Sequence, residues 1–175
     1  MMAGEEMDSF LQQGLKSYPE AKAAVETYEQ EIQNRLAELF ETTAWNHFQP
    51  RRGERGRGKA VWMGADRSSD GRYICAYQNS DAEGGASVEL GLWWGSAKAR
   101  EGAIMFCGFW QRGQLWSVRL STPTSPIRCE PINRNRARLF VVVDEGFDLD
   151  TTGRALLAEL DRALRDPDDS QVPTS

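Results

Sequence analysis

The spacing of apolar residues in this chain changes once, and that change limits the folds open to it. Up to about Thr43 the apolar residues recur at steps of three and four, which predicts one amphipathic helix of about six turns. Its apolar stripe consists of Ala21, Val25, Tyr28, Ile32, Leu36, Leu39 and Phe40. The opposite face carries Glu26, Glu29, Glu31 and Glu38, which we expect to be solvated.

From Lys59 onward the step becomes two, as in strands with one buried face. The predicted strands are Lys59–Met63, Arg72–Gln78, Ser87–Trp94, Ala103–Trp110, Gln114–Leu120 and Arg138–Val143. The fourth and fifth are joined by three residues that end in a glycine, which predicts a hairpin. The run Arg138–Val143 is apolar on both faces, so we expect it inside the sheet rather than at an edge.

Helices are expected on both sides of this run of strands. A short helix over Met7–Leu15 precedes the long one, and Ser17 and Glu20 between them have the spacing of a capping box. Leucines at helical spacing after Asp148 or Asp150, either of which can cap the helix, predict a C-terminal helix.

This order of elements predicts an α+β protein. We expect a single domain over residues 1–165, with one antiparallel or mixed sheet of five to six strands on which the long N-terminal helix and the C-terminal helix pack. Residues 166–175 have little to bury and are predicted to form a disordered tail.

Composition narrows the class of protein. The formal net charge of −5 argues against general binding to polyanions. The chain has no apolar window of about 18 residues, and its acidic N-terminus lacks the features of a secretory signal, so we expect a cytoplasmic protein without membrane contact. Cys75 and Cys107 fall in predicted strands, where a thiol is usually a small buried hydrophobe. With His47 as the single histidine, we expect no metal and no cofactor.

Basic residues are concentrated in two stretches of this acidic chain. The first carries Arg51, Arg52, Arg55, Arg57 and Lys59 against one glutamate, a sum of +4. The second carries Arg128, Arg134, Arg136 and Arg138 against one glutamate, a sum of +3, so the rest of the chain sums to −12 (−5 − 7). If the two stretches meet as neighbouring loops, they would form an anion-binding patch suited to phosphate or to nucleic acid.

The first basic stretch also imitates a nucleotide-binding loop through Gly53, Gly58 and Lys59. Such a loop needs a strand before it and a helix after it, whereas here a helix precedes and a strand follows. Ala60 also lacks the hydroxyl group that would hold magnesium. We therefore interpret the resemblance as accidental.

Tryptophans form the strongest candidate for a binding surface. Trp93 and Trp94 are neighbours in a predicted strand, so their side chains must point to opposite faces of the sheet. Trp110 and Trp116 raise the same question in the predicted hairpin. An exposed tryptophan on a sheet face is a frequent anchor for a protein partner, while the alternative is that helices and loops cover both faces.

These features lean away from an enzyme and predict a protein that acts by binding another protein through its tryptophans and its acidic helix faces. By charge, that partner would be basic, such as a nucleic-acid-processing protein that is inhibited or recruited. The alternative is binding of nucleic acid or a phosphate ligand through the two arginine-rich stretches. His47 and the acids near Asp148 lie at predicted helix ends, where their charges stabilise the helix dipole. Neither catalysis nor a metal is needed to explain them.

Overall fold

The computed structural model describes residues 2–50, 61–68, 71–80, 85–94, 103–111 and 123–164. Its elements are α1 (Met2–Thr42), β1 (Val61–Ser68), β2 (Gly71–Asn79), β3 (Ala86–Trp94), β4 (Ile104–Gln111), β5 (Arg128–Asn133), β6 (Arg136–Val142) and α3 (Leu149–Ala163). The six strands form one sheet in the order β1-β2-β3-β4-β6-β5, and every neighbouring pair is antiparallel. The predicted α+β fold with an N-terminal and a C-terminal helix is confirmed.

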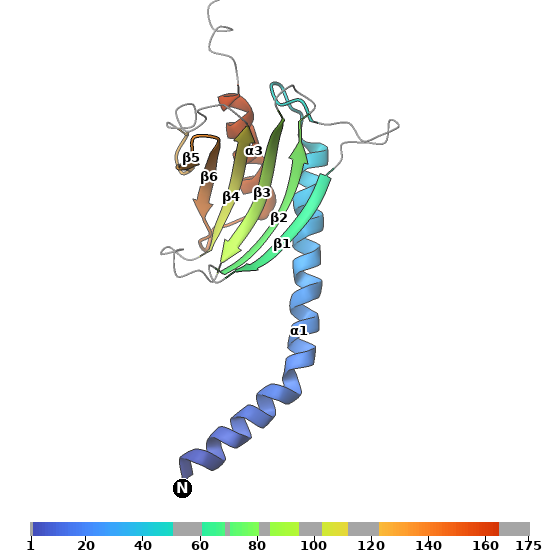
Figure 1. The fold of residues 1–175 in the computed structure, drawn as a ribbon, viewed down its shortest axis with the longest axis vertical. Coiled ribbons are helices and arrows are strands. Elements are labelled where there is room, and N and C mark those ends of the chain that lie inside the picture. The colour runs from blue at the N-terminus through green and yellow to red at the C-terminus, as the bar shows by residue number, and fades with distance from the viewer. Residues whose placement is uncertain are drawn as a thin grey trace, which may run out of the picture.

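Both helices lie behind the sheet in Figure 1, on the same face. α1 contacts β1 and β2, α3 contacts β4 and β6, and the two helices contact each other. The main core lies between the helices and this covered face; among its fully buried side chains are Leu36, Phe40, Ile74, Leu90, Met105, Leu139, Leu156 and Leu160. Gly153 lets α3 approach closely, because a Cβ atom there would lie 2.6 Å from a Leu39 methyl group and 3.0 Å from the Met105 methyl group.

A buried carboxylate joins the end of α1 to α3. The side chain of Asp161 accepts hydrogen bonds from the backbone N–H groups of Asn46, His47 and Phe48, each at 2.9 Å. On the same stretch of chain, Trp45 packs against Phe48 with ring centroids 4.8 Å apart. The segment after α1 is therefore held to the helix layer by both hydrogen bonds and rings.

α1 is one helix, and the predicted break near Ser17 is wrong. Pro19 lies inside it, and Figure 1 shows that α1 bends in its N-terminal half. Good helix formers on both sides of the proline explain why it bends the helix rather than ending it.

Two residues of the predicted helix faces also differ from expectation. Glu29 is buried, at 8% exposure, because it lies three residues before Ile32 and seven before Leu36 and so shares the packed side. Tyr28, expected in the apolar stripe, is 64% exposed because α1 reaches the sheet only after it.

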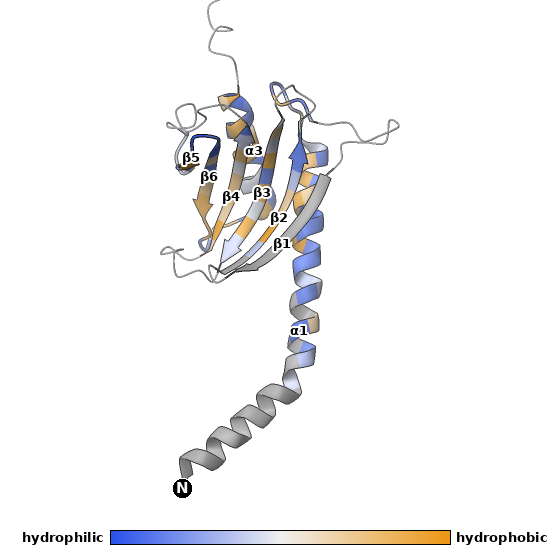
Figure 2. Ribbon diagram, in the orientation of Figure 1, coloured by the Kyte–Doolittle hydropathy of each residue, from blue (hydrophilic) through white to orange (hydrophobic). Residues whose placement is uncertain are grey.

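The β5–β6 region corrects the prediction of a second basic loop. Arg128–Asn133 is a strand, paired with β6 through a tight turn at Arg134 and Asn135. Figure 2 shows that this hairpin is strongly hydrophilic at its turn and becomes hydrophobic along β6. β6 lies between β4 and β5, which confirms that the apolar run is inside the sheet.

The predicted hairpin between β4 and Gln114–Leu120 is wrong. From Ile104 to Trp110, β4 pairs with β6 on one side, and it pairs with β3 on the other. Both edges of β4 are thus used. Gln114–Leu120 and the predicted tail lie outside the described residues.

Candidate functional site

The face of the sheet opposite the helices carries the candidate site. Pairing between strands places its residues in four rows: Ser87, Trp110 and Arg136; Tyr77, Glu89, Gly108, Arg138 and Glu130; Cys75, Gly91, Phe106, Phe140 and Arg128; Tyr73, Trp93, Ile104 and Val142. We call these rows the helix-free face, since neither described helix lies on it (Figure 1). The first two rows contain the charged residues Arg136, Glu89, Arg138 and Glu130, and rings and aliphatic side chains dominate the last two.

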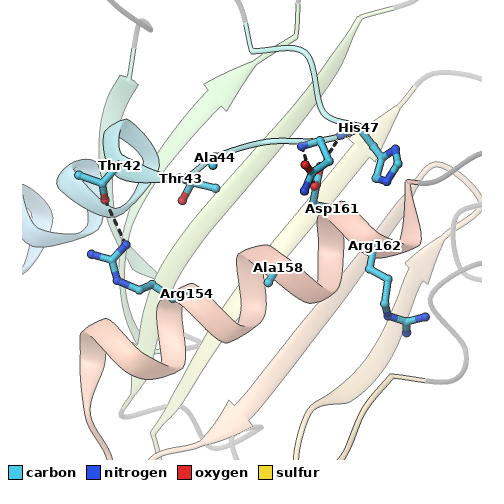
Figure 3. Close-up of a pocket in the computed structure, with 9 residues that line it drawn as sticks. Thr42, Thr43, Ala44, His47, Arg154, Ala158, Asp161 and Arg162 are labelled. Atoms are coloured by element: carbon cyan, nitrogen blue, oxygen red, sulfur yellow. Dashed lines mark hydrogen bonds between the residues drawn. The ribbon is translucent and has the colours of Figure 1, made fainter.

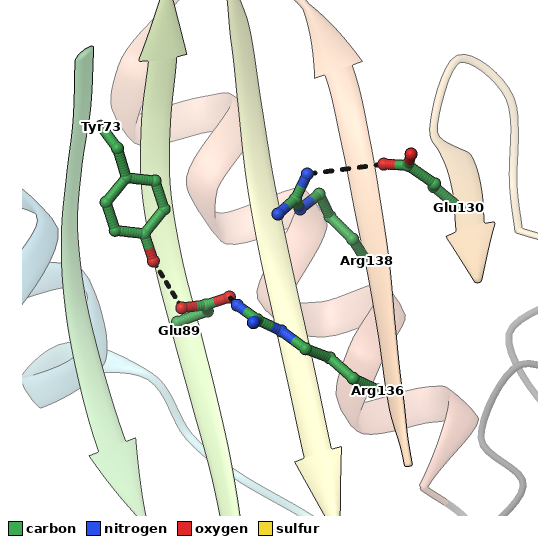
Figure 4. Close-up of polar contacts among 5 residues, drawn as sticks. All are labelled: Tyr73, Glu89, Glu130, Arg136 and Arg138. Carbon is green, nitrogen blue, oxygen red and sulfur yellow. Dashed lines mark hydrogen bonds and ion pairs between the residues drawn. The ribbon is translucent and has the colours of Figure 1, made fainter. Parts of the chain in front are cut away.

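Glu89 in β3 is the centre of a polar network on this face (Figure 4). Its carboxylate accepts a hydrogen bond of 2.5 Å from the hydroxyl group of Tyr73 and forms an ion pair with Arg136. A Cβ atom at Gly108 would collide with this carboxylate, so the glycine provides the space in which Glu89 lies across β4. The network links β2, β3 and β6.

Burial and the charge of Glu89 together fix the protonation of Tyr73 and Arg136. Burial, followed by the charge of Glu89, raises the pKa of Tyr73 far above its usual range, so the phenol remains a hydrogen-bond donor. Burial alone would lower the pKa of Arg136, but the charge and hydrogen bond of Glu89 outweigh it and raise that pKa. Neither group changes its protonation near neutral pH.

Arg138 lies over rings in the middle of the face. Its guanidinium carbon is 5.2 Å from the ring centre of Trp93 and 4.9 Å from that of Phe106. Its side chain is only 13% exposed, yet its one ion pair, Nη1 to Glu130 at 3.4 Å, is long, and its buried Nε–H has no hydrogen-bond partner among the described residues. A guanidinium has five donors, so Arg138 retains most of its capacity for hydrogen bonds to an anion.

Trp110 borders a hollow at one end of the same face. It is 40% exposed and directly faces Arg136, whose side chain is 37% exposed. A cavity of about 300 Å³ lies there, lined among others by Ser87, Glu89 and Gly108. An exposed ring, a guanidinium and a carboxylate therefore converge on one small volume.

The predicted tryptophans divide between these environments. Trp94 packs against the covered core, and Trp93 lies on the helix-free face under Arg138, so the two neighbours do point to opposite faces. Trp93 is half-buried, whereas Trp110 is exposed. Trp116 lies outside the described residues.

The predicted anion-binding arginines are only partly described. Arg128, Arg136 and Arg138 lie together on the helix-free face, with the Arg128 guanidinium 5.0 Å from the ring centre of Phe140. Arg134 is exposed in the β5–β6 turn. Arg51, Arg52, Arg55, Arg57 and Lys59 lie outside the described residues, so adjacency of the two stretches stays a prediction. Sequence reasoning missed the partners Glu89 and Glu130, since no spacing along the chain brings them to these arginines.

A second hollow, of about 400 Å³, lies between the end of α1 and α3 (Figure 3). His47, Arg154 and Arg162 line it, and Arg154 donates a hydrogen bond of 3.3 Å to the hydroxyl group of Thr42. Arg162 pairs with Glu159, and Asp161 holds the backbone of the adjoining segment. Arg154, Arg162 and Asp161 thus have structural partners, so this hollow is a joint between helices rather than the better candidate site.

The acids before α3 are also used locally. Asp148 caps the helix by accepting a hydrogen bond of 2.7 Å from the backbone N–H of Thr151, and Asp150 pairs with Arg35 at 3.1 Å. Hydrogen bonding from the Thr151 side chain, and then from its backbone, lowers the pKa of Asp148. Within the described residues, no group of three or more His, Cys, Asp and Glu side chains could hold a metal ion.

Cys107 and Cys129 do not offer a reactive thiolate. Burial, and then the charge of Glu89, raises the pKa of Cys107 well above its usual range. Burial, and then the charge of Glu130, raises the pKa of Cys129.

Comparison of the chain with protein-family models, with curated proteins and with solved structures gave no match. No helix among the described residues is long and apolar enough to span a membrane.

Proposed function

We propose that this protein is a non-enzymatic binding protein that recognises an acidic segment of a partner protein on its helix-free face. The observation that carries the proposal is Arg138, a largely buried guanidinium with most of its donors unused at the centre of that face. A buried charge without sufficient hydrogen bonds is costly, and a carboxylate from a partner would satisfy it.

The surroundings of Arg138 support a protein as the ligand. Trp110 and Arg136 face each other beside a small hollow, and tryptophan and arginine are frequent among residues that dominate binding energy. The half-buried rings of Trp93 and Phe140 provide apolar contact area beside the charged rows. An acidic segment with apolar residues at intervals would match both parts of the face.

Two expectations from the sequence stay predictions. Attraction to a basic partner depended on the acidic faces of α1, and the described residues Glu20, Glu26, Glu31 and Glu38 are exposed there. Binding of nucleic acid is expected to use both arginine-rich stretches, and residues 51–59 lie outside the described residues. Recognition of an acidic protein segment rests on Arg138, which is described, so we place it first.

Capture from a lysate of the native host tests this function. Tagged wild-type protein should retain a partner in near-stoichiometric amount, and Trp110→Ala and Arg138→Met should each reduce capture at least about tenfold, the effect of about 1.4 kcal/mol. Arg154→Ala, an exposed arginine on α3, is the matched control and should capture as the wild type does. Equal capture by all four proteins, or no capture by the wild type, would contradict the proposal.

A further inference from the structure

The N-terminal part of α1 forms a second surface on which no described helix or strand packs. We define the arm as Met2–Tyr28, the part of α1 before Glu29, its first described buried residue. Every described side chain from Ser17 to Tyr28 is exposed, and Figure 1 shows the arm extending away from the sheet. We propose that the arm of one copy of this protein lies on the helix-free face of a second copy. This inference rests on the proposed function and names the partner.

The arm extends beyond the sheet and gains no stability from packing on it (Figure 1). Helices without tertiary packing are marginal in water, and Gly14 and Pro19 both lower the helix propensity of this one. Tyr28 is 64% exposed and continues the spacing of Ile32 and Leu36, which pack into the core. A packing partner for the arm would explain why its helix persists beyond the sheet.

Charge makes the helix-free face a suitable partner. The arm contains Glu5, Glu6, Asp8, Glu20 and Glu26 against Lys16 and Lys22, a sum of −3 (2 − 5). The β5–β6 hairpin and β3 together present Arg128, Arg134, Arg136 and Arg138 against Glu89 and Glu130, a sum of +2 (4 − 2). Opposite charge steers association and favours this pairing over contact between two acidic arms.

Dimensions and topology favour contact between copies. A helix of 27 residues is about 40 Å long, whereas strands of seven to nine residues span about 23–30 Å, so the arm can cross the whole face. α1 packs on the covered face, so its arm starts on the wrong side of its own sheet (Figure 1). Two copies related by a two-fold axis can exchange arms, which covers the exposed arm and the charged rows of the face at once.

Arg138 is the expected anchor in this arrangement. A carboxylate of the arm, such as that of Glu20 or Glu26, can bind the guanidinium donors that Glu130 leaves unused. The side chain of Glu130 is 52% exposed, so a competing carboxylate can replace it at little cost. Tyr28 would contribute a ring to the apolar rows beside it.

Sedimentation equilibrium of the full chain tests the association. We expect a monomer–dimer equilibrium that weakens about tenfold between about 0.05 and about 0.5 M NaCl, because exposed charges are screened. Glu20→Lys with Glu26→Lys in the arm should weaken the dimer at least about tenfold. Glu38→Lys with Glu41→Lys changes the net charge equally on exposed positions of the same helix, and this control should change the dissociation constant less than about twofold.

Mixing two variants identifies which surfaces meet. The arm variant (Glu20→Lys with Glu26→Lys) and Arg138→Met should each be monomeric alone. An equimolar mixture should associate again, because the intact arm of the Arg138→Met protein can bind the intact face of the arm variant. Circular dichroism checks that each variant is folded.

A monomeric wild type, equal loss in the arm variant and its control, or a dimer that survives Arg138→Met would overturn the inference. Failure of the mixture to associate would overturn it as well. If the wild type is monomeric while lysate capture still depends on Trp110 and Arg138, the proposed function stands and the second copy is not the partner. Equal capture by the wild type and by the Trp110 and Arg138 variants would instead contradict the proposed function.

Discussion

The two faces of the sheet are built by alternate residues of the same strands, yet they differ in composition and in packing. On the covered face, leucine and other apolar side chains fill the space beneath α1 and α3. On the helix-free face, Glu89, Arg136 and Arg138 share the surface with rings. In β3 the change occurs between neighbours, since Glu89 points to one face and Leu90 to the other.

Each face contains a buried polar group that lacks a partner among the described residues. On the covered face it is the amide of Gln78, which is fully buried, and on the helix-free face it is the Nε–H of Arg138. Gln78 lies beneath the helices, whereas 13% of the Arg138 side chain is exposed on the helix-free face, although its Nε–H is buried. The proposed recognition of an acidic segment therefore concerns the exposed part of this guanidinium.

The largest expected effect on stability comes from truncating a core side chain on the covered face. Leu90→Ala removes a fully buried side chain beside α3, and we expect it to lower the free energy of unfolding by about 3 kcal/mol. Urea denaturation followed by circular dichroism measures this. Ile132→Ala truncates an aliphatic side chain that is 39% exposed on edge strand β5, and it should cost less than about 1 kcal/mol. Similar losses in both variants would show that the core is not concentrated under the helices.

The next effect concerns the polar network of the helix-free face. Tyr73→Phe removes the 2.5 Å hydrogen bond to Glu89 and should lower the free energy of unfolding by about 2 kcal/mol at neutral pH, as expected for a bond to a charged group. Phenylalanine retains the stacking on Phe106, whose ring centre is 5.3 Å away. The loss therefore reports the hydroxyl group rather than the ring.

The same variant should change the dependence of stability on alkaline pH. The folded state raises the pKa of Tyr73 above its ordinary value of 10.0, so this stabilising contribution is complete below pH 10 and falls as the pH rises above it. Tyr73→Phe lacks this loss. Its unfolding free energy should therefore decrease less steeply above about pH 10 than that of the wild type. Parallel curves would show that Tyr73 titrates equally in both states.

Gln78 offers a test with the opposite sign. Gln78→Met replaces an unpartnered amide with an apolar side chain of similar length, and we expect a gain of about 1 kcal/mol in the free energy of unfolding. Arg138→Met should leave stability nearly unchanged or raise it, because methionine packs well on rings and Glu130 is exposed. Partner capture should distinguish the two variants, since only Arg138→Met should lose its partner. A destabilised Gln78→Met protein would indicate that the amide is satisfied in solution.

Most of the fold follows from apolar spacing. The periods of three to four and of two locate α1, α3 and the strands from β2 to β4, and the two-sided apolar run places β6 inside the sheet. β5 escaped detection because its residues are charged, and it contains Pro131, which is typical of an edge rather than of a buried strand.

Less of the candidate site than of the fold could be predicted from the sequence. Charge clustering singled out Arg128, Arg136 and Arg138, which lie together in the structure, but it could not show that strand pairing sets Glu89 and Glu130 among them. Nor could spacing identify Gly108, whose missing side chain leaves room for the Glu89 carboxylate across β4. These relations join residues far apart in the chain, and they become visible only when the register of the sheet is known.

The smallest expected change in stability comes from Glu130, and it sharpens the comparison most. Glu130→Gln removes the charge of the one described ion-pair partner of Arg138, through a long, exposed contact at 3.4 Å. Such pairs contribute little, so the free energy of unfolding should change by less than about 0.5 kcal/mol. If Arg138 is held for an acidic ligand, the loss of a competing carboxylate should strengthen binding several-fold, measured as a lower dissociation constant in sedimentation equilibrium. If Arg138 instead serves only to hold β5 to β6, the same variant should reduce stability and leave association unchanged, and the functional distinction between the two faces would fail.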